Sequence, residues 1–287
     1  MKQLSLLFVI LLLASCNIIN PDEREPTYIT INDIELQASA DEGGNSNNIK
    51  DAWVYVNSEF IGAYQMPTTF PVLGEGEKVI EVFAGIKVNG ISEFPDQYPL
   101  YERDSIFINL DDGENQTISP VVTYREDADF IMIEQFSSGD THNMSFDADG
   151  ISETEIEVVG GSGIIHLDTE NRFFDIASLE LDEFPQFSNV YYMEMDYKSD
   201  VLMNVGLVGY DNLNTPIVSN FNQGILPTTE WTKIYFDLSG PISDVENQLG
   251  VRYYRLHLTA AINPDDSENP MTEADIYLDN LKLVKFE

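Results

Sequence analysis

The sequence contains few of the residues from which catalytic and redox centres are built. It holds one cysteine, Cys16, and three histidines among 287 residues. A single cysteine cannot form an intramolecular disulfide, so burial or a bound metal has to stabilise the fold. His142, His166 and His257 show no metal-ligand spacing, and neither H-E-x-x-H nor G-x-S-x-G occurs. The sequence therefore predicts a protein that is not an enzyme.

Positive charge is also scarce. The chain has 14 lysines and arginines against 50 aspartates and glutamates, which gives a net charge of −36. Such a chain repels the phosphates of nucleic acids and the headgroups of anionic lipids. A strongly acidic surface favours solubility and attracts divalent cations. Nucleic acid is therefore excluded as a partner.

Long apolar runs are absent after residue 16, where none approaches the roughly 20 residues that a transmembrane helix needs. Before it, Lys2 precedes an apolar run over residues 4–13, and the tetrad Leu13-Ala14-Ser15-Cys16 closes the segment. This tetrad resembles the lipobox of bacterial lipoproteins. The resemblance implies a signal peptide over residues 1–16 and a Cys16 that carries acyl chains such as palmitate. It also implies a lipid anchor in the outer membrane, with possible exposure at the cell surface.

Residues 17–26 are polar, contain two prolines and carry an acidic cluster at residues 22–25. They show no hydrophobic periodicity, so we expect a flexible tether. An acidic patch close behind a lipidated cysteine resembles the signal that exports some lipoproteins to the outer face of the outer membrane. A plain solvated linker explains the same residues, and the sequence leaves both open.

Residues 27–125 have the pattern of a small all-β domain. Alternating or β-branched runs predict strands near residues 29–36, 53–56, 59–65, 79–85, 105–110 and 116–123. Asn57-Ser58 stands where a tight turn is expected. Strands at this spacing predict an immunoglobulin-like β-sandwich.

Within this domain, one run of features covers residues 54–62, Pro67 and residues 73–82. It consists of a strand, a turn, a glycine before a proline, and a glycine-containing turn before an alternating strand. This order resembles PEGA-type modules, although Ser58 stands where the family usually has glycine. The resemblance implies a spacer or surface-presentation domain.

The second domain, residues 129–287, follows a four-residue connector and is again rich in strands. We expect ten, separated by Gly, Pro, Asn and Asp clusters, near residues 130–136, 153–159, 163–167, 172–176, 190–198, 202–210, 217–221, 232–238, 253–260 and 274–286. Helical periodicity is scarce, and Gly160-Gly161-Ser162-Gly163 predicts a turn. The pattern is typical of a jelly roll, which makes the whole fold all-β with two sandwich modules.

Four features of the second domain resemble the carbohydrate-binding and galactose-binding-like jelly rolls. They are Glu134 in the first strand, Ser162-Gly163 before a strand, Trp231-Thr232-Lys233 entering a strand, and residues 277–281 in the last strand. The resemblance implies non-catalytic glycan binding. It also implies a structural Ca²⁺ ion held by Glu134 and Asp279, which would join the two ends of the domain with the oxygen ligands that calcium prefers.

Strand alternation predicts a ligand face on three strands. Along residues 190–197, 233–238 and 253–259, one side is apolar and the other carries a tyrosine beside charged groups. The predicted site consists of Tyr192, Glu194, Asp196, Tyr235, Tyr253, Arg255 and His257. Tyrosine rings stack on sugar rings, and charged groups bond sugar hydroxyls. An ordinary solvent-facing surface explains the same pattern, while Phe173-Phe174 and Trp231 are expected in the core.

Two functions remain open from the sequence. The first is a non-catalytic envelope lipoprotein that binds a polysaccharide through its jelly roll. The second is a structural accessory lipoprotein that binds protein partners in an outer-membrane assembly. A concave face with exposed aromatic rings favours the first function, and a flat apolar patch of several hundred Å² favours the second.

Overall fold

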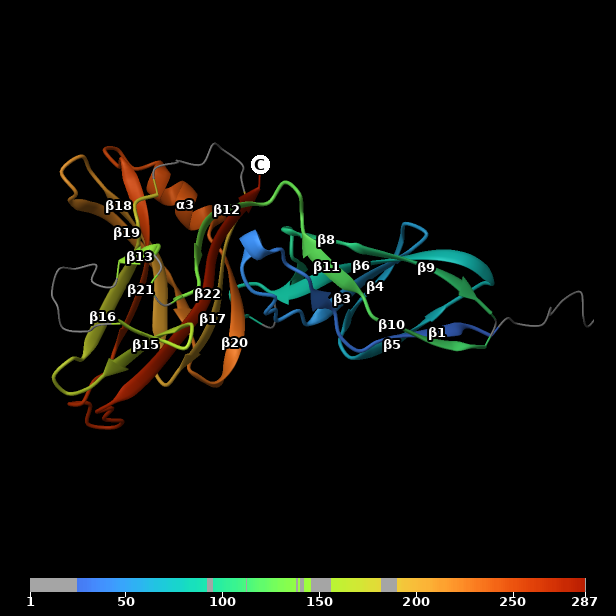
Figure 1. Cartoon of the computed structure of the whole chain (residues 1–287), viewed down its shortest axis with the longest axis horizontal. Helices are drawn as coiled ribbons and strands as arrows, with labels where there is room; N and C mark the ends of the chain where they lie inside the picture. The colour runs from blue at the N-terminus through green and yellow to red at the C-terminus, as the bar shows by residue number, and fades with distance from the viewer. Residues whose placement is uncertain are drawn as a thin grey trace, which may run out of the picture.

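The computed structural model describes residues 25–91, 95–111, 113–137, 139, 142–145, 156–181 and 190–286. The predicted signal peptide, Cys16 and most of the tether lie outside the described residues. Two β-sandwiches lie end to end along the long axis of the molecule (Figure 1). No helix within the described ranges is long and apolar enough to cross a membrane.

Among the residues that the structure describes, eleven strands form the N-terminal sandwich. They are β1 (Thr27–Ile31), β2 (Glu35–Leu36), β3 (Asp51–Val56), β4 (Glu59–Gln65), β5 (Thr68–Val72), β6 (Gly76–Lys87), β7 (Pro95–Gln97), β8 (Tyr101–Glu102), β9 (Asp104–Leu110), β10 (Asn115–Ile118) and β11 (Val121–Tyr124), with the 3-10 helix η1 (Ala40–Glu42) after β2. One sheet has the order β4-β3-β6-β7, and β9 also pairs with β6. Two three-stranded sheets, β10-β1-β5 and β2-β11-β8, complete the sandwich.

The hairpin between β3 and β4 confirms the predicted turn. Val56 pairs with Glu59, and the two residues between them, Asn57 and Ser58, have φ values of 50° and 67°. Positive φ at both central positions is the geometry that matches the twist of hairpin strands, and asparagine tolerates it well. The chain therefore reverses here within two residues.

In the described part of the C-terminal sandwich there are eleven strands and one α-helix. They are β12 (Asp129–Glu134), β13 (Met144–Ser145), β14 (Ile156–Val159), β15 (Ser162–Leu167), β16 (Phe173–Ser178), β17 (Val190–Ser199), β18 (Met203–Tyr210), β19 (Pro216–Ile225), β20 (Thr228–Asp237), α3 (Ser239–Glu246), β21 (Tyr253–Ala261) and β22 (Ala274–Phe286). The sheet pairings of the two sandwiches divide at residues 125–128, between β11 and β12.

The C-terminal domain is a jelly roll, as predicted. One sheet has the order β14-β15-β22-β17-β20, with β12 also paired to β22. The other has the order β13-β16-β21-β18-β19. Gly160 and Gly161, with φ values of 64° and 86°, form the expected turn between β14 and β15. The alternating apolar residues of both sheets meet in one buried core.

The helix α3 and the strand β13 were not expected from the sequence. The helix is eight residues long and has Gly240 and Pro241 in its first turn, a pair that reads as a loop. Its buried residues Ile242 and Val245 pack into the core of the jelly roll. Burial of this short apolar stripe, and not helix propensity, accounts for the element.

Candidate functional site

The three strands of the predicted ligand face do not share a sheet. β17 and β20 are neighbours, with Glu194 opposite Tyr235 and Asp196 opposite Lys233. β21 belongs to the opposite sheet, where it pairs with β16 and β18. The prediction of one face was wrong because period-two alternation gives the side of a strand but not its sheet.

Most of the β17–β20 half of that face is covered by the N-terminal sandwich. Tyr192, Glu194 and Tyr235 are 5%, 0% and 1% exposed, and both tyrosines belong to the apolar cluster of the N-terminal domain. Tyr98 packs edge-on against Tyr192 with ring centroids 5.0 Å apart. These tyrosines are therefore not stacking platforms for a ligand, because the N-terminal domain covers them.

A buried polar network joins the two domains at this place. The Glu194 carboxylate accepts hydrogen bonds from the Tyr98 hydroxyl (2.6 Å) and the Tyr124 hydroxyl (2.7 Å). The Lys233 ammonium lies 2.9 Å from the same carboxylate. Lys282 donates to the Tyr124 hydroxyl at 3.0 Å and to a backbone carbonyl of the segment before β3 at 3.2 Å.

Burial and charge act in opposite directions on this network. Burial alone would raise the pKa of Glu194, but the ammonium groups of Lys233 and Lys282 and the Tyr98 hydrogen bond outweigh it, and the pKa lies below its ordinary value. Burial lowers the pKa of Lys282 to about 8, although Glu194 opposes the shift. The carboxylate is therefore ionised at neutral pH and committed to the domain contact.

The three predicted residues of β21, Tyr253, Arg255 and His257, form a separate cluster. Both nitrogens of His257 are engaged, Nδ1 with Asp175 at 2.8 Å and Nε2 with the Tyr210 hydroxyl at 3.0 Å. The Tyr210 and Tyr253 rings are stacked at 5.0 Å, and the Arg255 guanidinium lies 5.8 Å from the Tyr253 centroid. Tyr253 and His257 are buried, so their rings offer no open platform.

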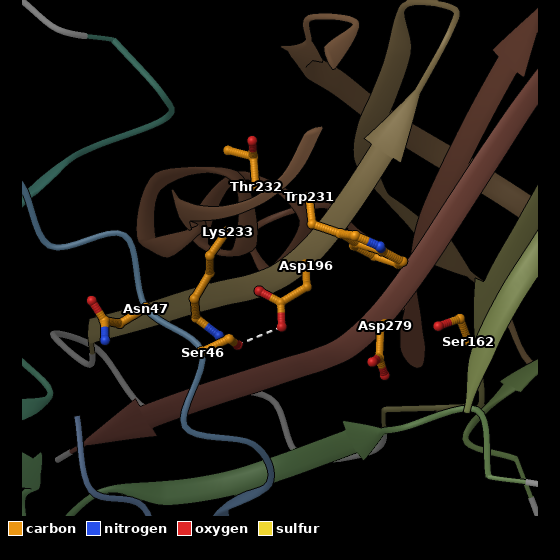
Figure 2. A pocket seen from close by; sticks show the side chains of 8 residues that line it. All are labelled: Ser46, Asn47, Ser162, Asp196, Trp231, Thr232, Lys233 and Asp279. Carbon is orange, nitrogen blue, oxygen red and sulfur yellow. Dashed lines mark hydrogen bonds between the residues drawn. The ribbon is translucent and has the colours of Figure 1, made fainter. Parts of the chain in front are cut away.

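The part of the six-stranded sheet that the N-terminal domain leaves uncovered holds a pocket of about 440 Å³. Figure 2 shows the Trp231 ring extending from β20 toward the side where Asp279 and Ser162 lie. Asp196 and Lys233 point toward the N-terminal segment that precedes β3. The lining consists of Ser46, Asn47, Ser162, Asp196, Trp231, Thr232, Lys233 and Asp279.

Trp231 supplies an accessible aromatic surface at this pocket. Its side chain is 50% exposed, which corrects the expectation that it belongs to the core. Tyr277 of β22 packs against it edge-on, with centroids 6.3 Å apart and planes at 67°. The Lys198 ammonium lies 4.8 Å from the Tyr277 centroid, so Tyr277 contacts both Trp231 and a cation.

The polar wall opposite Trp231 comes from both domains. Asp196 accepts hydrogen bonds from the Ser46 hydroxyl and, at 3.1 Å, from the Asn280 amide. Asn280 also donates to the Ser46 hydroxyl at 2.8 Å and accepts from the backbone of Gly44 at 3.0 Å. The segment before β3 is therefore fixed against β17 and β22. The resulting wall is preformed, so a ligand does not have to order it.

Asp279 has an unusual environment in this pocket. Burial raises its pKa to about 6, and the nearby Asp196 and Glu134 carboxylates add to the shift, while a backbone hydrogen bond opposes it. A carboxyl group with this pKa changes its protonation between mildly acidic and neutral pH. Perturbed acids in pockets are candidates for functional groups.

Sequence reasoning found Asp196 and Asp279 but missed Trp231 as a site residue. Alternation along β20 places Trp231 on the same side as Lys233 and Tyr235, away from the buried Ile234 and Phe236. That signal was present in the sequence. Ser46 and Asn47 carried no signal, because only the docking of the two domains brings them to the pocket.

The Glu134 carboxylate directs its oxygens at N–H groups of its own loop. It accepts from the backbone of Phe136 at 2.7 Å, from that of Asn143 at 2.7 Å, and contacts His142 Nδ1 at 3.1 Å. These hydrogens point at the oxygens that a cation would use, so this arrangement does not fit a Ca²⁺ ligand. Within the described ranges, no group of three or more His, Cys, Asp or Glu side chains is placed to hold a metal. The calcium ion stays a prediction.

No protein-family model matches the sequence, and no curated protein matches it. Solved structures with some likeness are carbohydrate-binding modules of family 29. One covers 55% of this chain and 88% of its own, with 14% identity and a TM-score of 0.36. Two variants of such a module, in complexes with mannohexaose and cellulohexaose, give 15% identity and TM-scores of 0.35 and 0.36, covering 55% and 56% of this chain and 92% and 93% of their own. Likeness at this level does not decide a ligand, and the residues of the pocket have to do so.

Proposed function

We propose that the protein is a non-catalytic cell-envelope lipoprotein whose jelly roll binds a polysaccharide at the Trp231 pocket. The half-exposed Trp231 ring, facing a preformed wall of carboxylate, ammonium, amide and hydroxyl groups, carries the proposal. The volume of the pocket, about 440 Å³, lies within the usual range for ligand sites. Its walls are the outer face of a jelly-roll sheet and the segment of the N-terminal domain that precedes β3.

The lining residues have the chemistry that a sugar requires. The flat Trp231 ring offers an apolar surface to the C–H face of a pyranose. The Asp196 and Asp279 carboxylates accept hydrogen bonds from hydroxyls, while the Asn47 amide donates them. This combination of an aromatic surface with hydrogen-bonding groups supports the binding of a sugar.

The proposal includes the lipid anchor at Cys16. Each buried methylene contributes about 0.8 kcal/mol, so two or three acyl chains hold a protein stably on a membrane. Residues 17–26 then act as the tether between the outer membrane and the first sandwich. Labelling cells with a palmitate analogue tests this directly. The wild-type protein should take up the label, and Cys16→Ser should not; equal labelling of both would refute the anchor.

Affinity electrophoresis against a panel of polysaccharides tests the glycan site. The panel includes glucans and mannans, because the modules above were solved with a cello- and a manno-oligosaccharide. Trp231→Ala should weaken binding at least tenfold, since stacking and burial of the ring are lost. Phe107→Ala is the matched control, because Phe107 is an exposed aromatic side chain (82%) on β9, away from the pocket.

The outcomes separate the two functions considered from the sequence. Retardation by one polymer that Trp231→Ala abolishes and Phe107→Ala preserves establishes the site. Retardation that both variants keep refutes this pocket. If no polymer is bound, the glycan function fails, and a protein partner should be sought by cross-linking on intact cells.

A further inference from the structure

A second pocket, of about 540 Å³, lies between the two domains beside the edge strand β20. Its walls come from the segment before β3, the end of β4, the end of β6 with the loop after it, β17, the end of β19 and β20 itself. The lining includes Asn48, Lys50, Gln65, Lys87, Asn89 and Gln223.

The charge of this lining is opposite to that of the chain. Three lysines, Lys50, Lys87 and Lys233, line the pocket, and no aspartate or glutamate does. The whole chain carries 50 acidic and 14 basic side chains, so a purely basic lining departs from its composition. A cavity lined by one sign of charge concentrates ligands of the opposite sign.

Two of the three lysines already pair with a carboxylate, and one can pair with a ligand. Lys87 lies 2.6 Å from the Asp51 carboxylate, and Lys233 lies 2.9 Å from Glu194. Lys50 is exposed and forms no ion pair with a residue that the structure describes. Its ammonium is therefore the group that can neutralise an anionic ligand.

The rest of the pocket is preformed and suited to sugar hydroxyls. The Asn48 side chain donates to the backbone of Lys233 at 2.8 Å, and its backbone N–H donates to the Tyr235 hydroxyl at 3.1 Å. The Asn89 backbone donates to the carbonyl of Tyr235 at 2.9 Å. These bonds fix the walls across the domain boundary. Gln65 and Gln223 add amides that both donate and accept.

The two pockets adjoin. Thr232 and Lys233 line both, and the neighbouring residues Asn47 and Asn48 line one each. A linear ligand that leaves the Trp231 pocket over this part of β20 enters the interdomain pocket without leaving the protein surface.

We infer that the interdomain pocket is a second subsite for the same polysaccharide and that it takes an acidic sugar, whose carboxylate or sulfate group pairs with Lys50. The inference rests on the proposed function, because it needs a chain already held at Trp231. It names the ligand class as a polysaccharide that carries an oxyanion on at least some of its residues. The ligand then spans both domains.

Matched polymers test the inference with the chain that starts at residue 17, in 0.15 M salt to screen the distant acidic surface. The pairs are polygalacturonate with its carboxyl-reduced form, alginate with its carboxyl-reduced form, and a sulfated galactan with its desulfated form. The wild type should bind the acidic member of a pair about tenfold more tightly, the range of one charge-assisted contact.

Lys50→Gln should abolish most of that preference by lowering the affinity for the acidic member. Lys78→Gln, which makes the same charge change at the distant end of β6, should keep the preference. A preference for a uronate pair identifies a carboxylate as the anion, and a preference for the sulfated pair identifies a sulfate ester.

Three results would overturn the inference. Equal affinity for both members of every pair shows that the pocket does not select an anion, while glycan binding at Trp231 stands. A preference that Lys50→Gln leaves intact places the anion elsewhere. Failure to bind any neutral or acidic polymer removes the proposed function, and this subsite with it.

Discussion

The hydroxyl of Tyr98 and the carboxylate of Glu194 lie 2.6 Å apart, in a contact closed to solvent between the two sandwiches. Tyr98 belongs to the first domain and Glu194 to the second, 96 residues later in the chain. Because the acceptor is ionised and buried, the bond is of the strong, charge-assisted kind. The domains are thereby held in one orientation, and both pockets depend on that orientation.

Removal of the Glu194 carboxylate should destabilise the protein severely. Glu194→Ala leaves Lys233 and Lys282 buried beside each other without a counter-charge, and loss of one partner from a buried ion pair costs about 3–5 kcal/mol. Urea unfolding measures this loss as a lower midpoint. Glu180→Ala is the control, because the exposed Glu180–Arg255 contact at 3.4 Å should contribute about 0–1 kcal/mol. A loss below 1 kcal/mol for Glu194→Ala would show that the network does not hold the domains together.

Lys282 should make the stability rise with pH on the alkaline side of neutrality. Its folded pKa of about 8 lies below the ordinary value of 10.5, so the unfolded chain binds more protons between these two values. The free energy of unfolding should therefore increase by about 2 kcal/mol from pH 7 to 9.5. Above pH 10 the trend reverses, since burial and the Glu194 charge raise the pKa of Tyr98.

The variant Lys282→Met isolates this effect. It should lack the rise between pH 7 and 9.5 while keeping the decrease above pH 10. Urea unfolding at each pH supplies the comparison. If wild type and variant show the same slope, Lys282 is not the titrating group.

Asp279→Asn should stabilise the protein at neutral pH. The folded pKa of about 6 lies above the ordinary 3.8, so the native state holds the proton longer and loses stability as pH rises from about 4 to 6. The group is partly exposed, and after discounting for solvent screening the cost at pH 7 is about 1 kcal/mol. Thermal unfolding should place the variant above the wild type at pH 7 and level with it at pH 4. A variant that is less stable at pH 7 would mean that a bound cation or partner uses the carboxylate.

Calcium should leave the melting temperature unchanged if the hydrogen bonds at Glu134 are the relevant arrangement. An ion whose free concentration is 100 times its dissociation constant stabilises the folded protein by about 2.7 kcal/mol. This shifts the melting temperature by about 5–10 °C for a chain of this size. Scans in metal-free buffer with added CaCl₂ or with EDTA decide between the two cases. A calcium-dependent rise that Glu134→Gln abolishes would restore the calcium site.

Local patterns in the sequence were enough to predict the all-β architecture. Asn57-Ser58 and Gly160-Gly161 marked turns because few other residues accept positive φ, and alternation along β17 correctly placed Met193 and Met195 in the core. The helix α3 was not predicted because eight residues with Gly240 and Pro241 in the first turn are too short to show a helical period.

The sequence by itself determined which side of each strand is apolar. Successive side chains point to opposite faces, and the apolar face packs into the core of the strand's own domain. The sequence did not determine what covers the polar side. The tertiary structure decided that Tyr192 and Tyr235 meet the N-terminal sandwich while Trp231 stays open, because this depends on contacts between residues far apart in the sequence. The same docking brings Ser46 and Lys50 beside β20, and both pockets exist only through it.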